Sequence, residues 1–154
     1  MFPIHRLLTP LTLPLRLMPI GLHSRALAAV LNTVLSDALR EGELDFLEGR
    51  LVAVEIDDLG VGYRLGVRDG RILGFGGRDG ADATIAGGIR ELLLLAARRE
   101  DADTLFFQRR LRMSGDTELG LYLKNFLDAF EPPARWQPLV RALEGLADLP
   151  LPGR

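Results

Sequence analysis

The sequence of 154 residues contains no cysteine and only two histidines, His5 and His23, both near its beginning. Without cysteine the chain cannot form disulfides, bind metal or iron–sulfur clusters through thiolates, or use a cysteine nucleophile. The two histidines are remote in sequence from every later group of acidic residues, which disfavours a histidine-based triad and a two-histidine metal site. We therefore expect neither a metal ion nor another cofactor. The lack of cysteine fits a reducing cytoplasm.

Catalytic groups are scarce in the rest of the chain as well. It has three serines, and its carboxylates fall mostly in predicted turns. Asp57 and Asp58 fit a hairpin turn better than an acid–base pair. Arg109, Arg110 and Arg112 lie near acidic residues and fit a solvated strand face better than an anion site. We expect no catalytic residues. The alternative is a small enzyme in which a polar residue acts in a pocket, the candidates being Asp57, Asp58, Arg110 and Asp116.

Positive charge does not dominate the chain. It has 19 basic and 21 acidic residues and a formal net charge of -2, although residues 1–36 hold three arginines and no acidic residue. A protein that binds nucleic acid usually shows a dominant basic surface, so we expect no nucleic-acid partner.

Apolar residues, by contrast, are plentiful. They make up 47% of the chain, and charged residues make up 26%. This composition is typical of one soluble globular domain with its own core.

The first 23 residues form an apolar and basic arm. Four prolines interrupt its apolar run too often for a membrane-spanning helix, namely Pro3, Pro10, Pro14 and Pro19. The arm also lacks the continuous apolar stretch of a signal peptide. Two interpretations remain: an extended arm packed on the domain, or a segment that docks on a membrane surface or a partner. We expect a cytoplasmic protein, and under the second interpretation this arm would be its point of peripheral contact with the inner membrane.

After the arm, the apolar pattern changes from helical to extended. Ser24 is a suitable N-cap for a helix whose apolar residues recur every three or four positions until Gly42. Alternation of apolar and polar residues then predicts an antiparallel meander. Its strands lie at 52–56, 61–67 and 71–75, and its turns at 57–60 and 68–70.

The next segments predict further strands and helices. Residues 74–80 are rich in glycine but lack dinucleotide-binding spacing, so they predict a loop. Residues 82–88 predict a fourth strand and residues 89–99 a helix covered on more than one side. A polar segment and residues 104–110 lead into a fifth strand, in which Leu111 and Met113 alternate with arginines.

The last two helices lie at 117–130 and 135–149. Gly115 makes the turn before the first of them, and Asp116 caps its N-terminus. Its apolar residues form one stripe that faces the sheet: Leu119, Tyr122, Leu123, Phe126, Leu127 and Phe130. Helices and strands in this order predict an α+β fold with the helices on one face of the sheet.

Three stretches in this order resemble the sterol carrier protein 2 type lipid-binding domain over residues 24–131. Residues 47–72 carry the strand meander. Residues 82–96 carry a D-x-T-I-x-G strand that enters a helix, and residues 110–130 carry a strand ending in Gly-Asp before an apolar helix. The resemblance implies an α+β fold with a five-stranded, mainly antiparallel sheet, covered by helices and enclosing an apolar tunnel. Residues 132–154 would add a C-terminal helix and tail.

The tunnel walls follow from the apolar faces of the expected helices and strands. We expect lipid-binding side chains at Leu92, Leu95, Phe106, Phe107, Met113, Leu119, Tyr122, Leu123, Phe126 and Leu127.

Residues 105–131 are further similar to a family of bacterial ubiquinone biosynthesis accessory factors. This resemblance implies a non-catalytic protein that holds and presents isoprenoid quinone intermediates in the oxygen-independent pathway. Proteins of UbiU and UbiV type would be its partners and would supply the hydroxylation chemistry. The alternative is a general carrier of phospholipids or sterol-like lipids.

Overall fold

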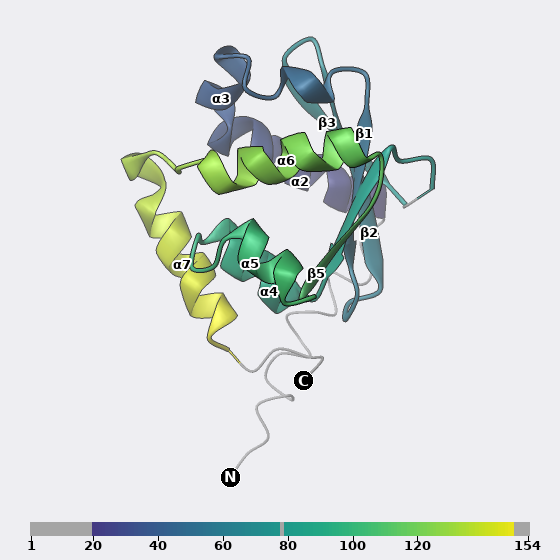
Figure 1. The fold of residues 1–154 in the computed structure, drawn as a ribbon. Coiled ribbons are helices and arrows are strands. Elements are labelled where there is room, and N and C mark those ends of the chain that lie inside the picture. Colours follow the sequence, from purple (N-terminus) through teal and green to yellow (C-terminus); the bar gives the residue numbers. More distant parts are fainter. Residues whose placement is uncertain (1–19, 78, 150–154) are drawn as a thin grey trace.

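The computed structural model describes residues 20–77 and 79–149 (Figure 1). One sheet has the spatial order β3-β2-β1-β4-β5. Its strands are β1 (Leu51–Ile56), β2 (Val61–Arg68), β3 (Arg71–Gly76), β4 (Ala83–Gly87) and β5 (Leu111–Gly115). The β1 and β4 strands pair in parallel, and the other neighbouring pairs are antiparallel. The expected meander and the five-stranded, mainly antiparallel sheet are confirmed.

The turn between β2 and β3 has the geometry that its sequence predicts. The φ angle is 51° at Asp69 and 72° at Gly70. Positive φ at both central residues is typical of a type I′ hairpin turn, which matches the twist of the flanking strands. The loop expected at 74–80 begins later than predicted, because β3 continues to Gly76.

The described chain also contains six helices and two short 3-10 turns. The helices are α2 (Ile20–Val34), α3 (Ser36–Arg40), α4 (Ile89–Ala96), α5 (Ala102–Phe107), α6 (Thr117–Ala129) and α7 (Gln137–Ala147). The turns are η1 (Asp45–Leu47) and η2 (Ala134–Trp136). Figure 1 shows the helices gathered on one side of the sheet.

Two contacts identify the covered face. In α2 the backbone oxygen of Ser24 lies against Gly74 of β3, and in α6 Gly120 lies against Met113 of β5. The strand register aligns Gly74 of β3 with Gly115 of β5 across the sheet, so the two residues face the same side. Met113 lies two positions before Gly115 in β5 and therefore faces this side as well. The helices α2 and α6 therefore cover one face, as the sequence predicted.

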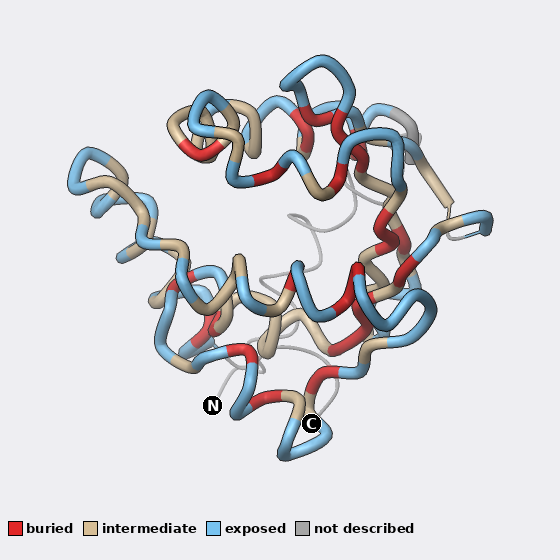
Figure 2. Tube along the Cα trace, turned by 45° about the horizontal axis from the view of Figure 1, so that its top comes forward, coloured by how far each residue is buried: buried red, intermediate tan, exposed pale blue. Residues whose placement is uncertain are grey.

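The hydrophobic core lies between this face and the helices, and Figure 2 shows buried residues in both layers. The sheet contributes Val52, Val67, Ile72, Ala83, Ile85 and Leu111. The helical layer and the segment around η1 contribute Ala28, Leu44, Leu47, Leu105, Leu119 and Leu123.

The first helix differs from the prediction. It begins at Ile20, so Ser24 is buried inside it and does not cap it. The α2 helix also ends earlier than predicted, at Val34, and a second helix, α3, follows it. The helical segment ends at Gly42, which has a φ of 76°. Gly74 lies directly against the backbone of Ser24, so α2 approaches the sheet closely at this point. A small residue such as serine suits position 24, because it lies inside the helix and against the sheet. Most of the expected arm lies outside the described residues.

The α2 helix is joined to the edge strand β3 by a side chain that imitates a neighbouring strand. The Asn32 side-chain nitrogen donates to the carbonyl of Ile72 at 2.8 Å, and the Ile72 N–H donates to the Asn32 side-chain oxygen at 2.7 Å. Both backbone groups of Ile72 are thereby satisfied at the edge of the sheet.

The α5 helix was not predicted from the sequence. It occupies residues 102–107, where we expected a polar segment leading into a strand. Its N-cap is Asp101, whose side chain accepts a hydrogen bond from the backbone nitrogen of Thr104 at 2.8 Å. The preceding helix α4 is shorter than predicted, because it ends at Ala96 and Arg98 adopts a φ of 58°.

The α6 helix agrees with its prediction. The side chain of Asp116 accepts a hydrogen bond from the backbone nitrogen of Leu119 at 2.9 Å, and Gly115 has a φ of 91° in the preceding turn. The C-terminal helix is also present, as η2 followed by α7.

Candidate functional site

A row of aromatic side chains lies between α6 and η1. Tyr122, Phe126 and Phe130 follow one another at intervals of four residues and so lie along one side of the α6 segment. Phe46 of η1 contacts them, with its ring centroid 5.8 Å from that of Tyr122 and 6.4 Å from that of Phe126. The centroids of Phe126 and Phe130 are 5.6 Å apart. We call these four residues the aromatic row. Such spacings are favourable for aromatic pairs.

Eleven apolar side chains pack against the core without being fully buried, and we call this set the apolar interior. They come from α2, α3 and the residue between them, and from the sheet, α4, α5, α6 and η1. The set is Leu31, Leu35, Leu39, Phe46, Leu65, Leu92, Leu95, Phe106, Met113, Phe126 and Leu127. Apolar surface left in contact with water is what an apolar ligand would cover.

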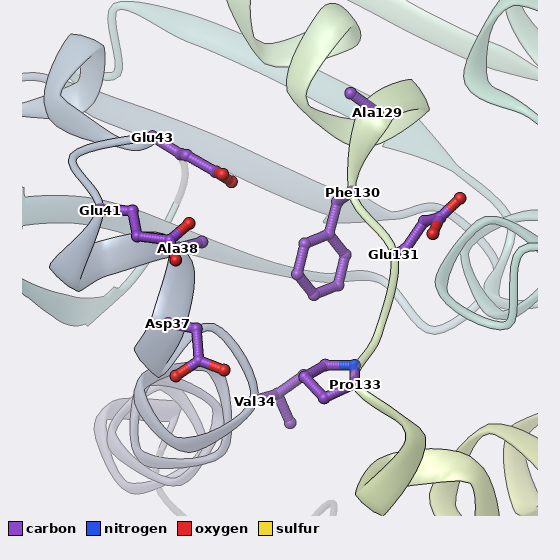
Figure 3. A pocket seen from close by; sticks show the side chains of 9 residues that line it. All are labelled: Val34, Asp37, Ala38, Glu41, Glu43, Ala129, Phe130, Glu131 and Pro133. Atoms are coloured by element: carbon purple, nitrogen blue, oxygen red, sulfur yellow. The ribbon is translucent and has the colours of Figure 1, made fainter.

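A pocket opens at the end of the aromatic row, between α3 and the chain that leaves α6 (Figure 3). Its volume is about 190 Å³. The ring of Phe130 points into it, and its other apolar walls are Val34, Ala38, Ala129 and Pro133. Four acidic residues also line it, namely Asp37, Glu41, Glu43 and Glu131. Since small-molecule sites usually measure about 300–1,000 Å³, a larger ligand would have to displace side chains along the aromatic row.

The residues expected to line a lipid tunnel divide into four groups. Six belong to the apolar interior: Leu92, Leu95, Phe106, Met113, Phe126 and Leu127. Tyr122 lies in the aromatic row, while Leu119 and Leu123 are buried in the core. Phe107 is 92% exposed at the end of α5, so the structure does not bring it together with the others.

Sequence reasoning did not assign five members of the apolar interior to the site. Phe46 was assigned only to a turn, and Leu65 only to a strand. The regular four-residue spacing of Leu31, Leu35 and Leu39 was a usable signal, because it places these leucines on one side of the chain.

The carboxylates of the β1–β2 turn have structural partners. Asp57 forms an ion pair with Arg112 of β5, with an oxygen–nitrogen distance of 3.0 Å. Asp58 accepts a hydrogen bond at 2.9 Å from the backbone nitrogen of Ile89, the first residue of α4. A carboxylate there satisfies a free N–H and complements the helix dipole. Both residues thus stabilise the fold around the turn.

The other two residues of the enzyme alternative are also engaged. Arg110 lies 2.7 Å from Glu100 and 3.7 Å from Glu91, and Asp116 caps α6. Within residues 20–77 and 79–149 no group of three or more His, Cys, Asp or Glu side chains is arranged to hold a metal ion.

Ion pairs fix the helices around the apolar interior. The Lys124 ammonium of α6 lies 2.6 Å from Asp103 of α5 and 3.6 Å from Asp128. The hydrogen bond to Asp103 raises the pKa of Lys124. Between α4 and α7, Asp148 lies 2.6 Å from Arg99 and raises the pKa of Arg99 through a hydrogen bond.

A polar contact also lies where α2 crosses the sheet. The Tyr63 hydroxyl lies 3.4 Å from Nδ1 of His23, and burial raises the pKa of Tyr63. None of the helices in the described part of the chain has the length and apolar character needed to cross a bilayer.

Comparison with known proteins agrees with this architecture. The model of the SCP-2 sterol transfer family matches residues 28–128. The chain is 41% identical to the "Ubiquinone biosynthesis accessory factor UbiT" of Escherichia coli strain K12, over 90% of this chain and 79% of that protein.

Solved structures show the same fold. The "UbiJ-SCP2 Ubiquinone synthesis protein" superposes with a TM-score of 0.58 at 24% identity, covering 72% of this chain and 93% of that one. The apo form of sterol carrier protein 2 from Yarrowia lipolytica gives a TM-score of 0.50 at 15% identity, covering 72% of this chain and 94% of that one. On the family match and on its identity to UbiT, this chain belongs to the SCP-2 sterol transfer family.

Proposed function

We propose that this protein is a non-catalytic, lipid-binding accessory factor of ubiquinone biosynthesis, which holds isoprenoid quinone intermediates and presents their rings to partner enzymes. The observation that carries the proposal is the 41% identity with UbiT over 90% of the chain. The apolar interior supports the proposal, because its side chains are not fully buried and a prenyl tail would cover their remaining apolar surface.

The energetics of such binding are favourable without polar recognition of the tail. Covering apolar surface contributes about 25 cal/mol per Å², so a tail that covers 200 Å² gains about 5 kcal/mol before the costs of ordering. In the proposed complex the tail lies along a tunnel between α6 and the sheet, against Phe46 and the predicted lining residues. Leu119 and Leu123 support the wall from the core, and Phe107 takes no part.

The pocket at Phe130 is the proposed mouth of this tunnel. There the ring of the intermediate would remain accessible to partner proteins of UbiU and UbiV type in the oxygen-independent pathway. The protein would work in the cytoplasm and contact the inner membrane through its N-terminal residues.

Native mass spectrometry of the purified protein tests the proposal. The protein is purified from bacteria grown without oxygen, and the lipids that it releases in the mass spectrometer are identified. We expect prenylated phenols or quinones. Ala129→Trp, which fills the pocket at Phe130, should lower their occupancy, whereas Ala142→Trp at an exposed position of α7 should not. Protein without any lipid, or equal occupancy in both variants, would contradict the proposal.

A general carrier of phospholipids or sterol-like lipids is the second candidate, favoured by the sterol transfer activity in the family's name. Deletion of the gene separates the two. If the protein serves quinone synthesis, ubiquinone should fall in cells grown without oxygen. Unchanged ubiquinone together with bound phospholipid would support the general carrier.

A further inference from the structure

The β2 and β3 strands present an exposed patch on the face of the sheet that α2 and α6 leave open. Gly74 and the residues aligned with it face the helices, and alternate residues of a strand point to opposite faces. Leu73 and Phe75 therefore lie on the open face, where they are 40% and 44% exposed. The register places three arginines beside them. We call this set the β3 patch: Arg64, Arg68, Arg71, Leu73 and Phe75.

A groove of about 350 Å³ borders the β3 patch where α2 lies against β3. Arg25 of α2 and Arg71 of β3 both line it, together with Leu73 and Phe75. The remaining lining residues are Ala28, Ala29, Asn32, Ile72 and Gly74. Since Asn32 already satisfies both backbone groups of Ile72, the groove does not offer a free strand edge there. It offers apolar walls and guanidinium groups.

The charge of this region is opposite to that of the whole chain. Arg25 joins the three arginines of the patch, and the acidic residues of the turns that flank β3 are Asp69 and Asp79. The chain as a whole carries a net charge of -2. Among the described residues, neither Arg25 nor Arg71 forms an ion pair.

Unlike Arg25 and Arg71, Arg64 has defined partners on the neighbouring strand β3. Its guanidinium lies 5.9 Å from the ring centroid of Phe75 and donates to the carbonyl of Gly76 at 2.9 Å. These contacts hold a cation beside an exposed aromatic ring. Aromatic and basic side chains in this arrangement suit the boundary between lipid headgroups and acyl chains.

We propose that the β3 patch and the adjoining Arg25 form a docking surface for the anionic surface of a phospholipid bilayer. The arginines pair with headgroup phosphates, while Leu73 and Phe75 enter the apolar boundary beneath them. Charge identifies the occupant, since an anionic surface compensates Arg25 and Arg71 and a neutral or basic protein does not. This surface is separate from the apolar interior, so the proposal stands whether or not the interior binds a lipid.

The size of the electrostatic contribution can be estimated. A basic residue close to an anionic membrane contributes about 1 kcal/mol, which corresponds to about fivefold in affinity. Replacing both Arg25 and Arg71 by glutamine should therefore weaken vesicle binding by about 25-fold. Binding should also fall as salt is raised, because salt screens exposed charges.

Sedimentation of the full chain with lipid vesicles tests the docking surface. Vesicles of phosphatidylglycerol and phosphatidylethanolamine should bind the protein, and vesicles of phosphatidylcholine alone should bind it far less. Arg25→Gln/Arg71→Gln and Leu73→Ser/Phe75→Ser should each weaken binding. The matched control Phe107→Ser/Arg141→Gln removes one exposed aromatic residue and one exposed arginine elsewhere, and it should bind as the wild type does. Circular dichroism verifies that every variant is folded.

Three results would overturn the proposal. The first is a wild-type protein that does not bind anionic vesicles. The second is wild-type binding by both β3 patch variants, which would leave the proposed N-terminal contact as sufficient and the β3 patch without a role in docking. The third is a dimer, seen by light scattering, that Leu73→Ser/Phe75→Ser dissociates, because the patch would then bind a second copy of the chain.

Discussion

The substitution Asn32→Asp should weaken the junction between α2 and the edge strand β3. An aspartate retains the oxygen that accepts from the Ile72 N–H, but it loses the nitrogen that donates to the Ile72 carbonyl at 2.8 Å. The change removes one hydrogen bond and leaves a carbonyl facing a carboxylate, at a combined cost of about 2–3 kcal/mol at pH 7. For a chain of this size the melting temperature should fall by roughly 5–10 °C.

The cost of Asn32→Asp should depend on pH in a defined direction. The carbonyl of Ile72 opposes the charged form of the new carboxyl, so its folded-state pKa lies above the unfolded value. The destabilisation is complete above the folded-state pKa. It is relieved as the pH falls, because the protonated carboxyl can donate to the carbonyl.

Urea unfolding of the wild type and the variant at pH 7 and pH 4 measures both effects. Asn125→Asp is the matched control at an exposed position of α6, and it should change stability by no more than about 0.5 kcal/mol. Equal losses in the two variants, or a larger loss for Asn32→Asp at pH 4 than at pH 7, would refute the role given to Asn32.

Four further predictions concern local structure. Gly74→Ala would place a Cβ atom 2.2 Å from a backbone oxygen of α2 and should cost about 1–3 kcal/mol or more in urea unfolding. By contrast Gly145→Ala, with open space around its Cβ in α7, should stabilise the protein by about 0.5–1 kcal/mol. Asp116→Ala removes the N-cap of α6 and should cost about 1 kcal/mol, measured as a lower urea midpoint with an unchanged slope. The pKa of Asp101 is lowered by hydrogen bonds from Thr104, chiefly from its side chain and then from its backbone. The stability that this cap contributes is therefore present above the ordinary aspartate pKa of about 3.9, and it is lost as the pH falls through the lower pKa of Asp101 in the folded state. The stability difference between the wild type and Asp101→Ala should therefore shrink as the pH falls below the ordinary aspartate pKa, and a difference that stays constant between pH 7 and pH 2 would contradict this.

The elements that could be predicted from sequence are those with strong local signals. The α6 helix follows Gly115 and its N-cap Asp116 and carries a regular apolar stripe, so its start and its buried side could both be inferred. The β2–β3 hairpin could be inferred because Asp69 and Gly70 tolerate positive φ between two alternating segments.

The elements that were missed depend on contacts distant in sequence. Serine is favourable at an N-cap, but Ser24 lies inside α2 because the helix packs closely against Gly74 of β3. The α5 helix has only six residues, too few for a periodic apolar pattern, and its N-cap Asp101 lies in a run of polar residues.

The candidate site could be predicted in part for the same reasons. Apolar helix faces identified Phe126 and Leu127, which belong to the apolar interior. Phe107 was assigned to the site because α5 was not recognised, and the end of that helix leaves its ring in solvent. The pairing of Phe46 with α6 joins two distant segments, and no local pattern encodes such a contact.

The central claim is that a lipid occupies the apolar interior beside the aromatic row. Photo-crosslinking with a prenylated phenol that carries a diazirine on its tail tests this most directly, when labelled peptides are mapped by mass spectrometry. We expect labels at Phe46, Phe126, Leu127 and Phe130, and weaker labelling in Ala129→Trp. No labelling, or labelling confined to the β3 patch, would contradict it.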